Sequence, residues 1–121
     1  MTDPGGPTGG ELLAAISNAI VQVFSECYGR GPTKAKTYVD DVYVFTILED
    51  VLTPVEETLV NNGREDLVRE VRICFQTIMA DQFKGAVEEL TKRKVVTYQS
   101  QIAFHPVVAF EVFVLDGQPE A

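Results

Sequence analysis

The chain has 121 residues and a mass of 13.3 kDa, a length that accommodates one domain. Hydrophobic residues make up 45% of it, enough to build a core without disulfide or metal cross-links. Its 18 acidic residues exceed the 10 basic ones, so the formal net charge is −8. Because nucleic-acid-binding proteins carry a basic face, this charge argues against DNA or RNA as a partner.

Cysteine usage and the absence of targeting signals predict a cytoplasmic protein. Cys27 and Cys74 lie in apolar helical periods and not in a metal-binding or redox spacing, so we expect both to be reduced and buried. The N-terminus lacks the basic and apolar regions of a secretion signal, and no apolar run approaches the roughly 18 residues of a membrane span. We therefore expect no direct membrane insertion, no metal and no cofactor.

The N-terminal part predicts a tail followed by a helix. Residues 1–10 are rich in glycine and proline, which predicts a flexible segment. From Leu13 to Cys27, apolar residues recur every three or four positions, the period of a helix that buries one face. Gly29 ends this pattern and suits a helix C-cap.

A β-hairpin is predicted next, from a strand over 37–39 and a second strand over 42–48. Both segments are β-branched and aromatic, and Asp40-Asp41 between them favours a tight turn. The second segment is apolar on both faces, so we expect a central strand that is covered on both sides.

Two helices are predicted after the hairpin. In Thr53-Pro54-Val55-Glu56, threonine suits the N-cap, proline the first helical position and glutamate the third position of a capping box. Asn61-Asn62-Gly63 interrupts this helix, and a longer helix is predicted over about 64–91. Its apolar stripe should face the core. The stripe consists of Leu67, Val68, Val71, Cys74, Phe75, Ile78, Met79, Phe83, Ala86, Val87 and Leu90.

A second hairpin completes the predicted fold, with strands over 95–104 and 107–115 and a turn at His105-Pro106. The order α-ββ-αα-ββ predicts an α+β fold, in which two hairpins form a four-stranded antiparallel sheet and the helices pack mainly on one face. We expect a single domain over residues 11–115 and a C-terminal tail over residues 116–121.

Helices on one face would leave the other face of this sheet uncovered, although two of the strands are apolar on both faces. We therefore expect a homodimer that buries Tyr43, Phe45, Val107 or Phe113.

The strongest candidate for a binding site is the segment Tyr28-Gly29-Arg30-Gly31-Pro32-Thr33-Lys34-Ala35-Lys36. Its glycines let the backbone approach a ligand, and its cations suit a phosphate, carboxylate or bicarbonate. The spacing matches neither a P-loop nor a dinucleotide fingerprint. The same residues also suit a helix C-cap, a stiff connector and cations that complement a helix dipole, so both interpretations stay open. The candidate residues are Tyr28, Gly29, Arg30, Gly31, Lys34 and Lys36.

A second basic cluster, Lys92, Arg93 and Lys94, precedes the third predicted strand. If both basic clusters lie at the same end of the sheet, these three cations wall a pocket together with Tyr28, Arg30 and Lys34. The alternative is that all of them are surface cations near helix ends.

Nothing in the sequence supports catalysis. His105 is the only histidine and has no partner in metal or triad spacing, so we expect an exposed turn residue. No serine lies in a nucleophile motif. We therefore expect no enzyme activity and no catalytic residue.

Glu111 is a secondary candidate because it interrupts the apolar strand over 107–115. A carboxylate among such neighbours is expected either to reach a cation or to face a wet groove. We expect an edge or interface position.

Four segments, spread over about residues 11–115, carry a family resemblance: Tyr28 to Tyr38, Leu52 to Glu56, Gly63 to Arg69 and Glu89 to Val95. With them the chain resembles the MpsC family, a small bacterial family named for a component of a sodium-translocating, membrane-potential-generating system. The resemblance implies a soluble, non-catalytic accessory or regulatory protein associated with ion or inorganic-carbon transport, with membrane-transport subunits as partners. The alternative from the residues is a sensor that binds a small anion or nucleotide at the Gly-Arg-Gly-Pro loop.

Overall fold

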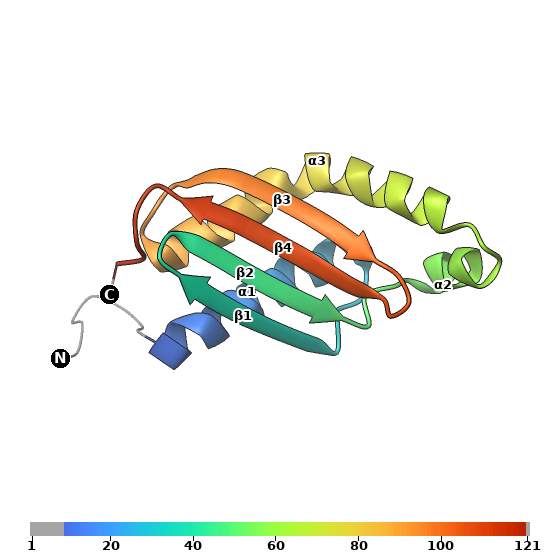
Figure 1. Ribbon diagram of the computed structural model, residues 1–121, viewed down its shortest axis with the longest axis horizontal. Helices are drawn as coiled ribbons and strands as arrows, with labels where there is room; N and C mark the ends of the chain where they lie inside the picture. Colours follow the sequence, from blue (N-terminus) through green and yellow to red (C-terminus); the bar gives the residue numbers. More distant parts are fainter. Residues whose placement is uncertain (1–8, 121) are drawn as a thin grey trace.

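A four-stranded antiparallel sheet with helices on one face forms the protein in the computed structural model, which describes residues 9–120 (Figure 1). This arrangement confirms the predicted α+β fold and the order of its elements. In chain order these are α1 (Gly9–Tyr28), β1 (Lys34–Asp40), β2 (Tyr43–Glu49), α2 (Pro54–Asn61), α3 (Glu65–Thr91), β3 (Val95–Ala103) and β4 (Val108–Leu115).

The two hairpins join through their inner strands, so the strand order is β1-β2-β4-β3. Tyr43 pairs with Val114 at one end of the β2–β4 ladder, and Glu49 pairs with Val108 at the other. β2 is therefore central, as predicted. In Figure 1, α1 and α3 lie behind the sheet and α2 lies beyond one of its ends, so the front of the sheet carries no helix.

The core lies between the sheet and the two long helices. Along α1 the residues Leu12, Ile16, Ile20 and Phe24 are buried at intervals of four, which confirms the predicted amphipathic helix. Phe113 on β4 also faces the helices and is 0% exposed, so the prediction that it joins a dimer interface is wrong. The other buried hydrophobic residues from the strands and the segment after β2 are Val44, Leu48, Val51, Leu52, Tyr98, Ile102, Ala109 and Leu115.

Several element boundaries differ from the predictions. β1 starts at Lys34, so Lys34 and Lys36 are strand residues and not part of the loop. α1 begins at Gly9, two residues inside the predicted tail, whose residues 1–8 lie outside the described part of the chain. Residues 116–120 return to the α3–β3 junction, where the Glu120 N–H donates to the Thr91 carbonyl.

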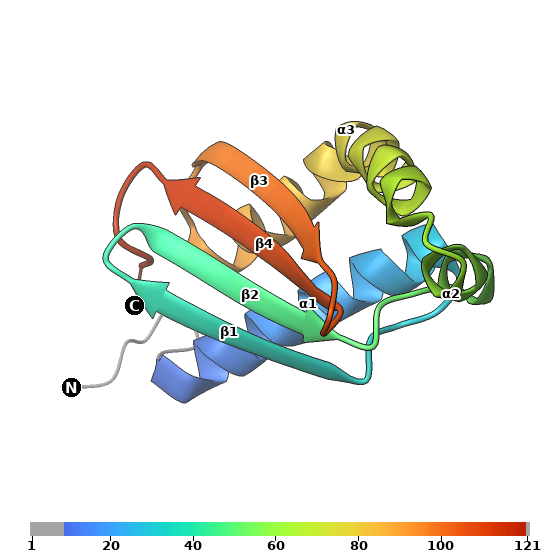
Figure 2. The same cartoon turned by 45° about the vertical axis from the view of Figure 1, so that its right-hand side comes forward.

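The middle of α3 was expected in the core but faces outward, so that part of the predicted stripe is wrong. Val68, Phe83 and Val87 are buried, whereas Val71 is 41% and Ile78 is 71% exposed. A helix of 27 residues is about 40 Å long, but a strand of eight residues spans only about 27 Å. Figure 2 shows the N-terminal half of α3 diverging from the sheet toward α2, so the sheet cannot cover the whole stripe.

The start of α2 has the predicted capping box. The Thr53 hydroxyl accepts from the Glu56 N–H, and the Glu56 carboxylate accepts from the Thr53 N–H at 2.9 Å. Pro54 occupies the first helical position, where it has no hydrogen bond to lose.

Loss of the N-cap hydroxyl should destabilise the protein. We expect Thr53→Ala to lower the free energy of unfolding by about 1 kcal/mol, because the Glu56 N–H loses its acceptor. Thr58→Ala in the same helix removes an exposed hydroxyl and should change it by less than about 0.5 kcal/mol. Urea denaturation of both variants measures the difference, and equal effects would contradict the capping role.

Candidate functional site

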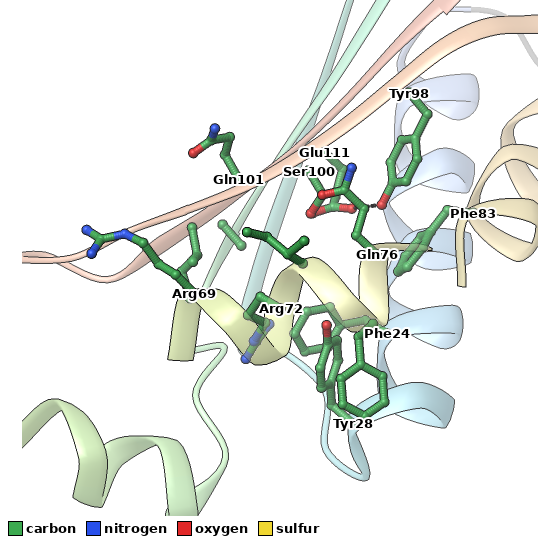
Figure 3. Close-up of a pocket in the computed structure, with 14 residues that line it drawn as sticks. Phe24, Tyr28, Arg69, Arg72, Gln76, Phe83, Tyr98, Ser100, Gln101 and Glu111 are labelled. Atoms are coloured by element: carbon green, nitrogen blue, oxygen red, sulfur yellow. Dashed lines mark hydrogen bonds between the residues drawn. The ribbon is translucent and has the colours of Figure 1, made fainter. Parts of the chain in front are cut away.

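A pocket of about 170 Å³ lies between α3 and the helix-covered face of β3 and β4. The C-terminal end of α1 contributes Phe24 and Tyr28 to its wall. In Figure 3, Glu111, Ser100 and Tyr98 lie together on the sheet side of the pocket. The pocket follows from the packing of α3, whose outer half rests on α1 and α2 instead of the sheet.

The floor of the pocket is a buried carboxyl group. Glu111 lies in the central strand β4 and is 3% exposed, so the predicted edge or interface position is wrong. Tyr98 Oη donates to Glu111 Oε1 at 2.5 Å, and Ser100 Oγ donates to Glu111 Oε2 at 2.7 Å. Antiparallel pairing places Ser100 directly opposite Glu111, and Tyr98 lies two residues away on the same face of β3.

Glu111 belongs to a row of polar residues that crosses all four strands. Thr37 pairs with Thr46, Thr46 pairs with Glu111, and Glu111 pairs with Ser100. Both threonines are buried, and the Thr37 hydroxyl lies 2.9 Å from that of Thr46 and 2.7 Å from that of Ser17 on α1. Hydrogen bonding to each other satisfies these hydroxyls inside an otherwise apolar layer.

Burial raises the pKa of Glu111 from its ordinary value of 4.5 to about 7, although Ser100, Tyr98 and the charge of Arg72 oppose the shift. Burial also raises the pKa of Tyr98, and the nearby Glu111 charge adds to it. Tyr98 therefore remains protonated and donates at neutral pH, while Glu111 can exchange its proton there.

The opposite wall is built around Arg72 of α3. Its guanidinium pairs with both carboxylate oxygens of Glu56 at 2.6 and 2.8 Å and donates to the Val51 carbonyl at 2.7 Å. It also lies 4.1 Å from the ring centroid of Tyr28 and 5.2 Å from that of Phe24. Burial alone would raise the pKa of Glu56, but hydrogen bonds from Arg72 and Thr53 outweigh it and lower that pKa. The arginine charge is thus compensated locally.

The structure does not bring the two predicted basic clusters together. Lys34 begins β1 opposite Glu49, whereas Lys94 precedes Val95, which pairs with Leu115 at the other end of the sheet. The prediction of a single pocket walled by both clusters is therefore wrong. The reason is topological, because α1 and α3 run into their hairpins at opposite ends of the sheet.

The first cluster has internal partners. Gly29 has a φ of +80° and donates its N–H to the Ser25 carbonyl, which confirms the predicted C-cap. Arg30 donates to the Leu52 carbonyl at 2.8 Å and to Asp50 Oδ2 at 2.9 Å. At Gly31 a Cβ atom would lie 2.5 Å from the Ser25 hydroxyl, so a larger residue there would displace this hydroxyl from its bond to the Val21 carbonyl. Anion binding by this loop stays a prediction.

The remaining predicted cations are spread over two surfaces. Lys36 is exposed on β1, with its ammonium 6.0 Å from the Tyr38 ring centroid. In the second cluster, Lys92 is the left-handed C-cap of α3, and Arg93 donates to the Gln118 carbonyl at 2.6 Å. The Lys94 N–H donates to an Asp116 carboxylate oxygen, so this cluster fastens the C-terminal segment.

Sequence reasoning gave no role to Tyr98, Ser100, Arg72 or Gln76, all of which line the pocket. Two features of the sequence pointed to the floor of the pocket. The alternation along β3 puts Tyr98 and Ser100 on one face, and Glu111 is the single acid in β4. No pattern in α3 marked Arg72, since its partner Glu56 is 16 residues away.

Two other predictions have mixed outcomes. His105 is exposed, as predicted, with a side chain 75% accessible and 3.4 Å from Glu65. Cys74 is exposed and Cys27 is half-buried, so the prediction that both cysteines are buried is wrong for Cys74. Within residues 9–120 no three His, Cys, Asp or Glu side chains come together in a group that could hold a metal ion.

A family model matches residues 8–117 of the 121-residue chain. Its description is "Na+-translocating membrane potential-generating system (MpsC)". The chain belongs to the MpsC family. The matched range contains every element of the fold and the whole pocket, so both belong to the MpsC domain. No curated protein and no solved structure gave a match.

The family description names a membrane system. Among residues 9–120, no helix is both long and apolar enough to cross a membrane.

The raised pKa of Glu111 should make stability depend on pH. Between about pH 4.5 and 7 the folded state binds more protons than the unfolded state, so the free energy of unfolding falls as pH rises. Glu111→Gln removes this contribution. We therefore expect the difference in the free energy of unfolding between wild type and variant to change by up to about 3 kcal/mol across that window. Urea denaturation from pH 4.5 to 8 measures it, with the exposed Glu89→Gln as control.

Parallel pH curves for wild type and Glu111→Gln would contradict the raised pKa. A difference that grows only above pH 7 would also contradict it, because both states are then ionised in the wild type.

Substitution of Arg30 and Lys34 separates the two interpretations of the basic loop. Arg30→Ala should lower the free energy of unfolding by about 1–2 kcal/mol, because bonds to Asp50 and Leu52 are lost. Lys34→Ala should change it by less than about 0.5 kcal/mol, because the side chain is exposed. If the loop also binds anions, phosphate raises the Tm of wild type saturably and the double variant loses that response. No phosphate response in the wild type excludes a phosphate site.

Proposed function

We propose that the protein is a cytoplasmic, non-catalytic accessory or regulatory protein of a Na⁺-translocating, membrane-potential-generating system, and that it works as a homodimer. Membership of the MpsC family supports the association with such a system. The uncovered apolar face of the sheet is the observation that supports an interaction protein most directly.

The open sheet face is apolar at its centre. Tyr43, Phe45 and Ile47 of β2 point away from the helices, and across the ladder they meet alternate residues of β4. Tyr43 is 54% exposed, and the rings of Phe45 and Phe110 lie 5.8 Å apart. The β4 residues of this face are Val108, Phe110, Val112 and Val114. A contiguous apolar patch of this kind marks an interaction site.

A second copy of the chain fits this face best. Two sheets pack face to face when their inner faces are apolar, and a two-fold axis presents the same patch from both sides. Both signs of charge occur at the edge of the patch, with Lys36 on β1 and Glu49 on β2. A two-fold pairing can therefore place opposite charges at the rim.

A separate apolar surface on the helices is available to a subunit of the membrane system. Ile73 is 65% and Ile78 is 71% exposed on α3, and Val55 on α2 is 71% exposed. Exposed apolar residues mark a protein contact where they gather in one patch, so these three are the candidates to substitute. This surface lies on the helix side of the protein, so it remains accessible when the open sheet face is paired.

Light scattering and affinity purification test the two surfaces separately. We expect wild type and Asn18→Asp to be dimers at tens of micromolar, and Phe45→Glu to be a folded monomer, because a buried carboxylate disrupts an apolar interface. Asn18 is an exposed α1 residue, so this control adds the same charge elsewhere. A monomeric wild type would rule out the homodimer.

Tagged protein from native membranes solubilised in mild detergent should retain subunits of an ion-translocating complex, identified by mass spectrometry. Ile73→Glu with Ile78→Glu should lose them while remaining dimeric. Recovery of no membrane subunit by the wild type would overturn the proposed association.

A further inference from the structure

We propose that the Glu111 pocket binds a small organic cation, with a primary ammonium or amidinium group on an apolar body about the size of one aromatic ring. This inference does not rest on the dimer or on the membrane association, although Ile73 lines the pocket and also belongs to the proposed membrane-subunit surface. It follows from the chemistry of the pocket floor, the shape of its walls and the way its arginines are already engaged.

The floor presents an acid that lacks a cation among residues 9–120. The ion pairs of this part of the chain use Asp50, Glu56, Glu65 and Asp66, and none uses Glu111. A buried carboxylate without a counter-charge is costly. A ligand cation on the floor supplies that charge.

The carboxyl group also has free hydrogen-bonding capacity. Each oxygen of Glu111 accepts one hydrogen bond, from Tyr98 or Ser100, whereas a carboxylate offers about four acceptor positions. An ammonium or amidinium group has several donors directed at such positions. The floor can therefore hold the head of a cation without breaking its existing bonds.

The walls suit an apolar body next to a positive charge. Phe24, Tyr28, Phe75 and Phe83 line the pocket, and aromatic faces attract cations. The volume of about 170 Å³ is close to that of an apolar cavity of about 150 Å³ that accepts benzene. One ring with a short charged arm fills this space.

The two arginines of the wall do not make an anion site in this arrangement. Arg72 is held by Glu56 and the Val51 carbonyl, so its charge is compensated and its Nη2 and Nε donors are occupied. Arg69 lies at the exposed rim with its guanidinium 4.8 Å from the Phe104 ring centroid.

The groups that face Glu111 from the surrounding elements set how its charge depends on pH. They are Tyr98 and Ser100 on β3, Thr46 on β2, Arg72 on α3 and Tyr28 on α1. Burial raises the pKa of Tyr28, so both tyrosines are neutral at the pH values of interest. Glu111 is thus the group whose ionisation changes near neutrality, and its charge sets the affinity of the pocket for a cation.

Titration of the full chain with benzylamine, followed by ¹⁵N NMR, tests the proposal. Benzyl alcohol has the same body without the charge, and benzoate reverses the charge. At pH 8 we expect benzylammonium to shift amides of α1, α3 and β4 around the pocket and to bind at least tenfold more tightly than either analogue. Glu111→Gln should lose at least tenfold in benzylammonium affinity, whereas the exposed Glu89→Gln should bind as wild type does.

The pH profile of the wild type tests the same point without a variant. Because the ammonium stays protonated from pH 6 to 8 while Glu111 ionises, benzylammonium affinity should rise across this range and benzyl alcohol affinity should stay flat. Equal binding of all three probes, stronger binding of benzoate, a flat benzylammonium profile, or no shifts at millimolar probe would each overturn the proposal.

Discussion

Arg72 joins parts of the chain that the sheet alone does not hold together. One guanidinium links α3 to the capping box of α2, to the segment after β2 and to the aromatic end of α1. The N-terminal half of α3 diverges from the sheet, so these contacts support it in place of close packing on the strands (Figure 2). The pocket exists because α3 is anchored here by an ion pair and not by close packing on β3 and β4.

The polar row across the covered face of the sheet has a related consequence. Thr37, Thr46, Glu111 and Ser100 occupy one level of the four strands, so the apolar core is divided where the pocket lies. At the β1 side of this row, the hydroxyl groups hydrogen-bond to one another. At the β3 side, Glu111 has a raised pKa and faces a cavity. This arrangement is more common at binding sites than in purely structural cores.

Local sequence patterns predicted most elements correctly. The capping box at Thr53, the C-cap at Gly29 and the turn at His105-Pro106 each depend on a few neighbouring residues, and all three occur where expected. The candidate site was predicted less well, since the basic loop was the leading candidate and Glu111 was assigned to an edge. Pairing between strands decides which side chains meet across a sheet, and the spacing of residues within one segment does not predict which strands pair.

The sequence by itself determined the α+β class, the order of the elements and the buried face of α1, because these follow from periodicity and turn chemistry over short ranges. Only the tertiary structure decided the strand order, which separated the two basic clusters and put Glu111 in a central strand beside Ser100. It also decided that α3 exposes Ile78 although the helical period predicted a buried stripe. A periodic pattern shows which residues share a face, whereas the length and position of the neighbouring elements determine how much of that face is covered.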